Sequence, residues 1–151
     1  MGAIGADIVP MTGENRILAY YGLHLLNQTP RVGFEALLKL ANKTGELSVT
    51  DVVFSIAPRI NAAGRIDSGN KAVELLLAKE ASEVEAVGSL INRHNETRKG
   101  LDRQITREAL KLIEEDNWLL NAKTTVVYHA DWHKGVVGIV ASRLIEEHYK
   151  P

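Results

Sequence analysis

The sequence predicts an α/β protein that is predominantly helical, and three observations lead to this fold class. Apolar residues recur at helical spacing through most of residues 16–78. A second stretch, residues 82–116, contains no residue that must end a helix. Near the end of the chain, a β-branched run gives way to helical spacing across a polar turn. We therefore expect a helical subdomain in residues 1–80, a long connecting helix in residues 81–117 and the start of a mixed-sheet domain in residues 118–151.

The composition excludes several classes of protein. Of the 151 residues, 45% are hydrophobic and 25% are charged, as in ordinary globular domains. No apolar run approaches the roughly 20 residues that span a bilayer, so we expect no membrane partner. The absence of cysteine excludes disulfides and thiolate metal sites, and it fits a cytoplasmic location. Because the net charge is −1, any nucleic-acid site must depend on local basic clusters.

The two ends of the chain resemble severed elements. Positions 2–10, GAIGADIVP, have the pattern of a strand interior followed by a turn. Asp7 stands at the end of this run, where a carboxylate can face a cleft and bind a divalent metal. The alternative is a surface or capping carboxylate, because no other carboxylates or histidines cluster in the sequence. We expect a fragment, whose exposed strand edges would allow self-association.

Four helices are expected before the long one. Apolar spacing places them near residues 16–27, 32–42, 48–57 and 71–78. Ser48 and Asp51 have the spacing of a capping box at the start of the third helix, and Pro58 is expected to end it. Ser68 is a candidate cap for the fourth helix.

The segment between the third and fourth helices breaks the helical pattern. Its sequence over positions 58–67 is PRINAAGRID. Arg59 and Arg65 are able to grip phosphates or carboxylates through paired hydrogen bonds, and Asn61 stands between them. The small residues around them permit another backbone to come close. The alternative is a connector between helices, with arginines that pair with local acids.

The long helix is expected to begin at a second capping box, Ser82 with Glu85, and to continue to about Asp116. Its inward stripe is apolar at both ends and polar in the middle, so we expect the middle to be wet, as in a helix that bridges two domains. Basic side chains between positions 93 and 111 would suit a groove for a phosphate backbone. The alternative is a solvated face with pairs such as Arg98 with Asp102.

The stretch at positions 124–143, TTVVYHADWHKGVVGIVASR, predicts a strand, a loop and a helix. His133 and Lys134 precede the helix N-terminus, where free N–H groups favour a phosphate. Gly135, Gly138 and Ser142 leave one face of the helix nearly bare. Such a face admits a close backbone, from either a sheet or a nucleic acid. The alternative for the histidine is simple exposure in a loop.

Two of these segments resemble motifs of the RecJ family of single-strand-specific DNA exonucleases, in the DHH phosphoesterase superfamily. They are PRINAAGR at positions 58–65 and WHKGVVGIVASRL at positions 132–144. Positions 4–10 and 12–16, IGADIVP and TGENR, are similar to the last metal-binding motif of the DHH domain and the turn after it. The motifs occur in the order and separation of the family, and the resemblance covers essentially the whole chain.

The resemblance implies degradation of single-stranded DNA from the 5′ end, with two manganese or magnesium ions held by aspartates and histidines. It implies a long helix that joins the DHH domain to a DHH-associated domain, with the DNA in the cleft between them. Asp7 would be a metal ligand. The resemblance places further residues along the DNA: Arg59, Asn61, Arg65, His133, Ser142 and Arg143.

The chain departs from the family pattern, because it contains no Asp-His-His tripeptide, no earlier Asp-x-Asp motif and no later glycine-rich motif. No complete catalytic set is therefore expected, and we predict that the chain alone is inactive and holds no metal stably. Two alternatives stay open. One is a DHH phosphoesterase that acts on short oligonucleotides, cyclic dinucleotides or pyrophosphate. The other is a non-enzymatic helical module that binds a partner protein.

Overall fold

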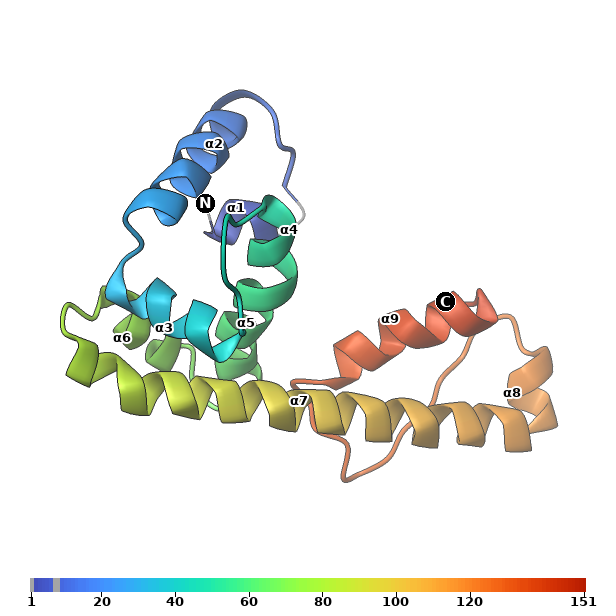
Figure 1. Cartoon of the computed structure of the whole chain (residues 1–151). Helices are drawn as coiled ribbons and strands as arrows, with labels where there is room; N and C mark the ends of the chain where they lie inside the picture. The colour runs from blue at the N-terminus through green and yellow to red at the C-terminus, as the bar shows by residue number, and fades with distance from the viewer. Residues whose placement is uncertain (1, 7–8) are drawn as a thin grey trace. The chain divides into compact units, whose positions relative to one another are not determined.

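The computed structural model describes residues 2–6 and 9–151, and the described residues form helices and loops without a β-strand (Figure 1). Contacts divide the chain into two compact units, Met1–Asn95 and Glu96–Pro151. The helix α7 (Ala81–Glu115) contributes to both units. No helix among the described residues is both long enough and apolar enough to cross a membrane.

The first unit is built from α1 (Gly2–Ala6), α2 (Gly13–Gln28), α3 (Val32–Leu40), α4 (Val49–Asp51), the π-helix η1 (Val52–Ile56), α5 (Ala57–Ile66), α6 (Asn70–Leu77) and the first part of α7. The prediction of a strand at positions 2–6 is wrong, because these residues form α1. Small residues with no neighbouring strand to pair with gain their backbone hydrogen bonds most easily within one helical turn.

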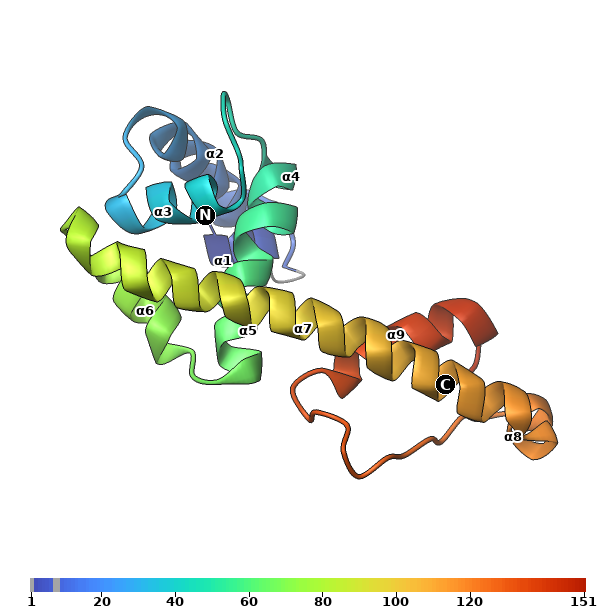
Figure 2. The same ribbon diagram turned by 60° about the horizontal axis from the view of Figure 1, so that its bottom comes forward.

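The core of the first unit is apolar. Helices α3 and α6 lie along the first half of α7 in both views (Figure 2). The side chains that they bury share the core with η1 and α7, and the fully buried ones are Leu37, Val52, Ile56, Leu75 and Ile91. Gly33 lies so close to α6 that a Cβ atom added there would be 2.0 Å from the carbonyl oxygen of Leu75. This crossing therefore depends on the absence of a side chain.

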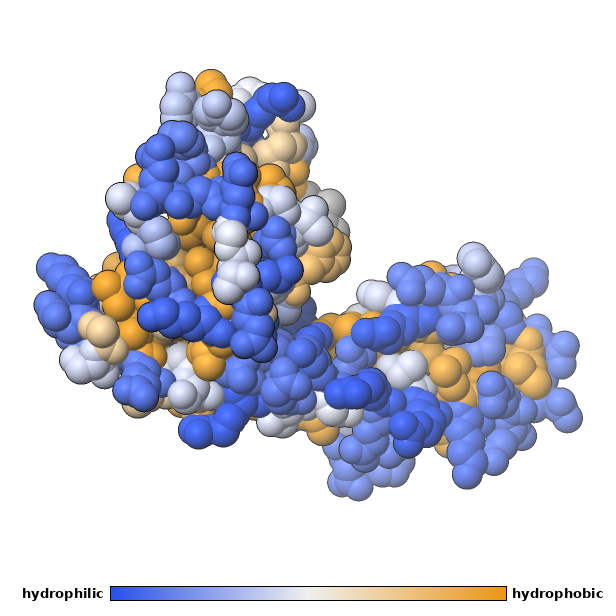
Figure 3. Space-filling view, in the orientation of Figure 1, coloured by the Kyte–Doolittle hydropathy of each residue, from blue (hydrophilic) through white to orange (hydrophobic). Residues whose placement is uncertain are grey.

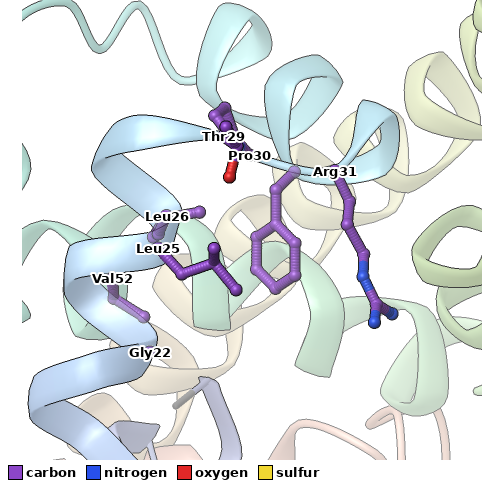
Figure 4. Close-up of a pocket in the computed structure, with 8 residues that line it drawn as sticks. Gly22, Leu25, Leu26, Thr29, Pro30, Arg31 and Val52 are labelled. Atoms are coloured by element: carbon purple, nitrogen blue, oxygen red, sulfur yellow. The ribbon is translucent and has the colours of Figure 1, made fainter.

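Helix α2 leaves much of its apolar surface uncovered by other described residues, and apolar side chains gather between α2 and α3 (Figure 3). Tyr20 and Tyr21 are 69% and 65% exposed, and their rings meet edge to face with centroids 5.2 Å apart. A hollow of about 190 Å³ lies beside this helix (Figure 4), and the residues that line it are Gly22, Leu25, Leu26, Thr29, Pro30, Arg31, Phe34 and Val52. The hollow is mainly apolar and holds no cluster of polar side chains.

The expected capping box at the start of the third helix is confirmed. Ser48 Oγ accepts the backbone N–H of Asp51, whose carboxylate accepts the backbone N–H of Ser48 at 2.9 Å. The Lys43 ammonium lies 2.6 Å from the same carboxylate. This cation, together with the Ser48 hydroxyl and N–H groups, holds the pKa of Asp51 well below its usual range.

Pro58 does not end the helix that precedes it, which corrects the sequence prediction. The chain continues from α4 through η1 into α5, with the proline in the first turn of α5. In η1, the N–H of Ala57 bonds to the carbonyl of Val52, five residues back. A regular α-helix has no room for a proline ring against its preceding turn, and the wider π turn provides that room. The segment expected to be an irregular connector is therefore helical.

The long helix has nearly the predicted extent, but two expectations about it are wrong. Its start is not capped by Ser82, because Glu83 instead accepts the backbone N–H groups of Lys79 and Glu80 at 3.0 and 3.3 Å. Both bonds lower the pKa of Glu83, and the bond from Lys79 has the larger effect. The polar middle of the predicted stripe is less wet than expected, since His94 is half-buried and the Arg98 side chain is only 16% exposed. Their neighbours Asn95 and Asp102 are 1% and 3% exposed. Polar residues at inward positions are buried here because neighbouring elements cover them, which sequence spacing does not reveal.

The second unit comprises the rest of α7, the short helix α8 (Asn117–Asn121), an extended segment and α9 (Val137–His148). Asp116 caps α8 by accepting the N–H of Trp118 at 2.8 Å. Lys150 binds the carbonyls of Leu119 and Leu120 at the other end of α8. The buried apolar residues are Ile105, Ala109 and Ile113 on α7, Leu119 on α8, and Val136, Val140 and Leu144 at α9.

The strand predicted at positions 124–128 is not formed. Thr125 donates its N–H to the carbonyl of Pro151 at 2.8 Å, but these residues are otherwise extended coil. Val126 and Tyr128 are 78% and 80% exposed. A strand is defined by pairing with another strand, and none of the described residues supplies one. The predicted strand-loop-helix is therefore a coil-loop-helix, and no sheet is formed.

Candidate nucleic-acid interface

The metal-binding candidate Asp7 lies outside the described residues. Among the residues that are described, no group of three or more histidine, aspartate or glutamate side chains comes together in a way that would hold a metal ion. The described part of the chain therefore does not fit a metal centre by itself, and no metal-dependent step is derived from it.

Arg59 is used for structure inside the first unit. Its Nε donates to Asn92 Oδ1 at 3.2 Å, and its two terminal nitrogens donate to the carbonyls of Ser55 at 2.6 Å and Leu40 at 3.1 Å. One guanidinium thus ties α5 to α7, to η1 and to the end of α3. A half-buried arginine with three protein acceptors fixes the position of α5.

Asn61 and Arg65 lie one turn apart on the exposed side of α5. They line a shallow groove between α5 and α6, together with Gly64, Gly69 and Val73. A Cβ added at Gly64 would meet the backbone of Gly69 at 3.8 Å, so the two helices are close at this point. The first unit therefore presents two of the three predicted polar side chains of this motif at its surface.

In the second unit, Trp132 anchors the loop that precedes α9. Its indole N–H donates to Glu108 Oε2 at 2.8 Å, and Gln104 donates to the other carboxylate oxygen at 2.9 Å. Both donors favour the ionised carboxylate and therefore lower the pKa of Glu108. The Gln104 bond has the larger effect and the Trp132 bond the smaller. The loop is thereby attached to α7 by a charge-assisted hydrogen bond.

His133 forms the turn that leads into α9. Its Nδ1 accepts the N–H of Gly135 at 3.1 Å, and its carbonyl accepts the N–H groups of Val136 and Val137 at 2.9 and 3.2 Å. Lys134 is exposed beside this turn. The lysine is therefore able to reach a solvent-side anion, whereas the histidine organises the turn.

Beside this turn lies a groove of about 580 Å³, between the extended segment 125–130 and α9. Lys134, Gly138 and Ala141 line one part of it, and Tyr128 lines another. A Cβ added at Gly138 would meet no described atom within 4 Å, so the bare helix face predicted from the sequence is open. At Gly138, therefore, no described residue packs against this face.

Ser142 and Arg143 follow on α9. Ser142 Oγ donates to the carbonyl of Gly138, one turn earlier, at 3.2 Å. Arg143 donates from Nε to Asp102 Oδ1 at 2.9 Å and from Nη2 to Asp102 Oδ2 at 3.0 Å. This two-point bond joins α9 to α7, and half of the arginine side chain remains exposed.

Comparison with known proteins places these motifs in a family. The single-stranded-DNA-specific exonuclease RecJ of Bacillus subtilis is 40% identical over 154 residues, which cover 100% of this chain and 19% of that protein. RecJ of Escherichia coli is 37% identical over 153 residues, which cover 97% of this chain and 26% of that protein. The chain is homologous to a segment of RecJ. No protein-family model matches it.

Solved structures agree with the RecJ assignment. The crystal structure of Thermus thermophilus RecJ in complex with Mn²⁺ is 36% identical, with a TM-score of 0.86, over 99% of this chain and 22% of that one. The structure of the same RecJ with Mg²⁺ has the same TM-score and identity. The chain thus spans between 19% and 26% of the length of the curated RecJ relatives compared above. The resemblance expected from the motifs is confirmed.

The structure shows the contacts of three further residues of this chain that the sequence did not predict, namely Asp102, Glu108 and Trp132. The sequence pairs Asp102 with Arg98, and that pair does exist at 3.9 Å, but the shorter bonds come from Arg143, 41 residues away. The position of Asp102 on the inward side of the long helix was the signal in the sequence that this acid has a partner. It does not identify a partner from a distant part of the chain.

Proposed function

We propose that this chain is part of a metal-dependent exonuclease that degrades single-stranded DNA from its 5′ end during DNA repair and recombination. Within that enzyme, the chain supplies residues of the DNA cleft. The observation that carries the proposal is sequence identity of 36–40% to RecJ exonucleases over 97–100% of this chain. A match of this extent includes both arginine-bearing motifs.

The geometry supports different tasks for the predicted DNA-contacting residues. Four of them are exposed with polar ends in reach of a phosphate, namely Asn61, Arg65, Lys134 and Arg143. Ser142 is also exposed, with its hydroxyl bonded to the helix backbone. Arg59 and His133 act at the cleft mainly by holding α5 and the turn before α9 in place.

The metal chemistry of the whole enzyme belongs to the same proposal. Manganese or magnesium, as in the RecJ crystal structures, would activate water and neutralise phosphoryl oxygens. Asp7 would supply one ligand, and the other ligands would come from outside the described residues. We expect no manganese-dependent release of nucleotides from a 5′-phosphorylated single strand by the purified chain.

We also propose the domain boundaries of the parent enzyme. Residues 1–80 would end the DHH domain, residues 81–117 would be the connector helix and residues 118–151 would begin the DHH-associated domain. A mixed sheet in that second domain is supported by the extended backbone of residues 125–128, whose apolar side chains are exposed. A cytoplasmic location follows from the DNA substrate. Self-association of the chain would occur through its uncovered apolar surfaces.

A salt-dependent binding measurement tests the DNA-binding part of the proposal. A fluorescent 5′-phosphorylated single-stranded oligonucleotide is titrated with the chain at several salt concentrations. Each phosphate contact should lower log K by about 0.7 for each unit of log salt concentration. Arg65→Ala should weaken binding to all sequences alike, by about threefold to tenfold, since it removes a charged donor to phosphate.

Arg16→Ala is the matched control, because it removes the same charge from an exposed position on α2. Binding that is absent at low salt, or that does not change with salt, would contradict DNA binding and favour a protein-interaction module. Equal effects of Arg65→Ala and Arg16→Ala would remove Arg65 from the site.

A further inference from the structure

Asp102 is a buried carboxylate with two arginines beside it. Its side chain is 4% exposed, although carboxylates are almost always exposed unless paired. Arg143 binds it at two points, and Arg98 Nη1 lies 3.9 Å from its Oδ2. All three residues belong to the second unit, with Arg98 and Asp102 one turn apart on α7 and Arg143 on α9.

Arg143 keeps free donors after it has bound Asp102. A guanidinium carries five N–H groups, and two of them point at the carboxylate. Nη1 and the second hydrogen of Nη2 have no protein acceptor in the described part of the chain. The side chain is 53% exposed, so these donors are accessible from solvent. Their direction is fixed because the guanidinium is planar and is bound along its other edge.

The charge of the cluster is positive. Arg98 and Arg143 supply two positive charges and Asp102 supplies one negative charge. Arg98 is 16% exposed, and its Nε has no hydrogen-bond partner among the described residues. An ion pair that only stabilised the fold would need one arginine. The second arginine leaves an excess positive charge where the free donors of Arg143 face solvent.

We propose that Asp102 is a positioning residue, which orients Arg143 to bind a phosphate of single-stranded DNA. The inference rests on the proposed function, since it names a residue that prepares the same cleft for its substrate. A free arginine side chain loses rotamer freedom when it binds a phosphate, and an arginine already held by Asp102 loses much less. Asp102 therefore strengthens DNA binding although it carries the same charge sign as DNA.

The substitution Asp102→Asn tests this inference because two effects have opposite signs. Removal of a negative charge, by electrostatics alone, should strengthen binding to a polyanion. Loss of orientation should weaken it, because an amide offers only one acceptor to the two donors of Arg143. We expect Asp102→Asn to weaken binding of a 5′-phosphorylated single strand by about threefold to tenfold, the range that ordering one long side chain implies. Affinity equal to or above that of the unsubstituted chain would overturn the inference.

A double-substitution cycle separates positioning from other roles. In an Arg143→Ala background, Asp102→Asn should cause no further weakening, since the residue that Asp102 orients is absent. Lys123→Ala, which removes an exposed charge from the same unit outside the predicted binding residues, is the control for charge alone. An equal loss with and without Arg143 would show that Asp102 acts through something else. If the unsubstituted chain does not bind DNA at all, the proposed function fails, and the inference fails with it.

If circular dichroism shows that Asp102→Asn does not fold, a second variant tests the inference. Arg143→Lys retains the charge at a half-exposed position but cannot make the two-point bond to Asp102. We expect it to bind DNA more weakly than the unsubstituted chain, although more tightly than Arg143→Ala because the positive charge is kept. In the unsubstituted chain, the Arg143 Nε–H should give a slowly exchanging NMR signal, with and without oligonucleotide. Full affinity in the lysine variant, or a rapidly exchanging signal, would overturn the inference.

Discussion

Arg59 and Arg143 are both arginines of sequence motifs, and the structure uses them in opposite ways. Arg59 donates to three acceptors in three different elements of the first unit. Arg143 donates to one carboxylate on one neighbouring helix and is half exposed. All three guanidinium nitrogens of Arg59 therefore donate to the protein. In Arg143, only Nε and Nη2 do so. The comparison shows that an arginine in a motif is a ligand-binding residue only if its partners leave donors free.

The two units differ in the same way. The first unit is held by a continuous apolar core and by one very close helix crossing. The second unit attaches its loop and its last helix to α7 by charge-assisted bonds to Glu108 and Asp102, in addition to apolar contacts. The first unit is thus stabilised mainly by apolar packing. In the second unit, directed polar bonds also fix the positions of Trp132 and Arg143.

The largest effect is expected from a change to the packing of the first unit. Gly33→Ala would place a Cβ atom 2.0 Å from the Leu75 carbonyl oxygen, so α3 and α6 must separate. We expect the free energy of unfolding, measured by urea denaturation, to fall by about 3 kcal/mol or more.

The matched control is Gly100→Ala, where an added Cβ meets no described atom within 4 Å. This exposed helical position should gain up to about 1 kcal/mol. A Gly33→Ala variant with unchanged stability would show that the crossing is not as close as described.

An intermediate effect is expected from the two arginines, changed one at a time to glutamine. Arg59→Gln should lower the free energy of unfolding by about 2 kcal/mol, because it leaves part-buried acceptors without their charged donor. Arg143→Gln should lower stability less and should lower DNA affinity more. Thermal denaturation and oligonucleotide titration measure the two properties separately. An Arg59 variant of full stability that fails to bind DNA would reverse the comparison.

The smallest effect is expected from Trp132→Phe, which keeps the ring and removes the N–H donor to Glu108. The pKa of Glu108 should rise toward its ordinary value, although the Gln104 bond still lowers it. NMR titration of the carboxylate measures this shift. Trp118→Phe, at a 72% exposed position, is the control.

The pH dependence of this variant follows from the sign of the shift. A carboxylate whose pKa is lower in the folded state stabilises that state above the pKa of the unfolded chain. The stabilisation disappears as the pH falls through the folded pKa. Trp132→Phe should therefore be less stable than the unsubstituted chain at neutral pH, and the difference should shrink in acid. A difference that does not change with pH would assign the loss to packing.

Local sequence determined most of the helices and one of the three predicted caps, that at Ser48, but not those at Ser68 and Ser82. The lack of helix-ending residues set the long helix to within two residues at each end, and the Ser48–Asp51 box formed as its spacing predicts. These features depend on residues three or four apart, which any helix brings together. The two motifs also carry the resemblance to RecJ, which the relatives confirm. Sequence alone therefore supplied the helical class and the candidate residues.

Tertiary structure decided what those residues do. Residues 124–128 have β-branched character, but a strand needs a paired strand, and the described residues offer none. Pro58 stayed within a helix because a π turn precedes it. Asp102 binds Arg143, and Arg59 binds Asn92 and the Leu40 carbonyl, across 19 to 41 residues of sequence. Such pairings arise from packing between elements, and no local spacing encodes them.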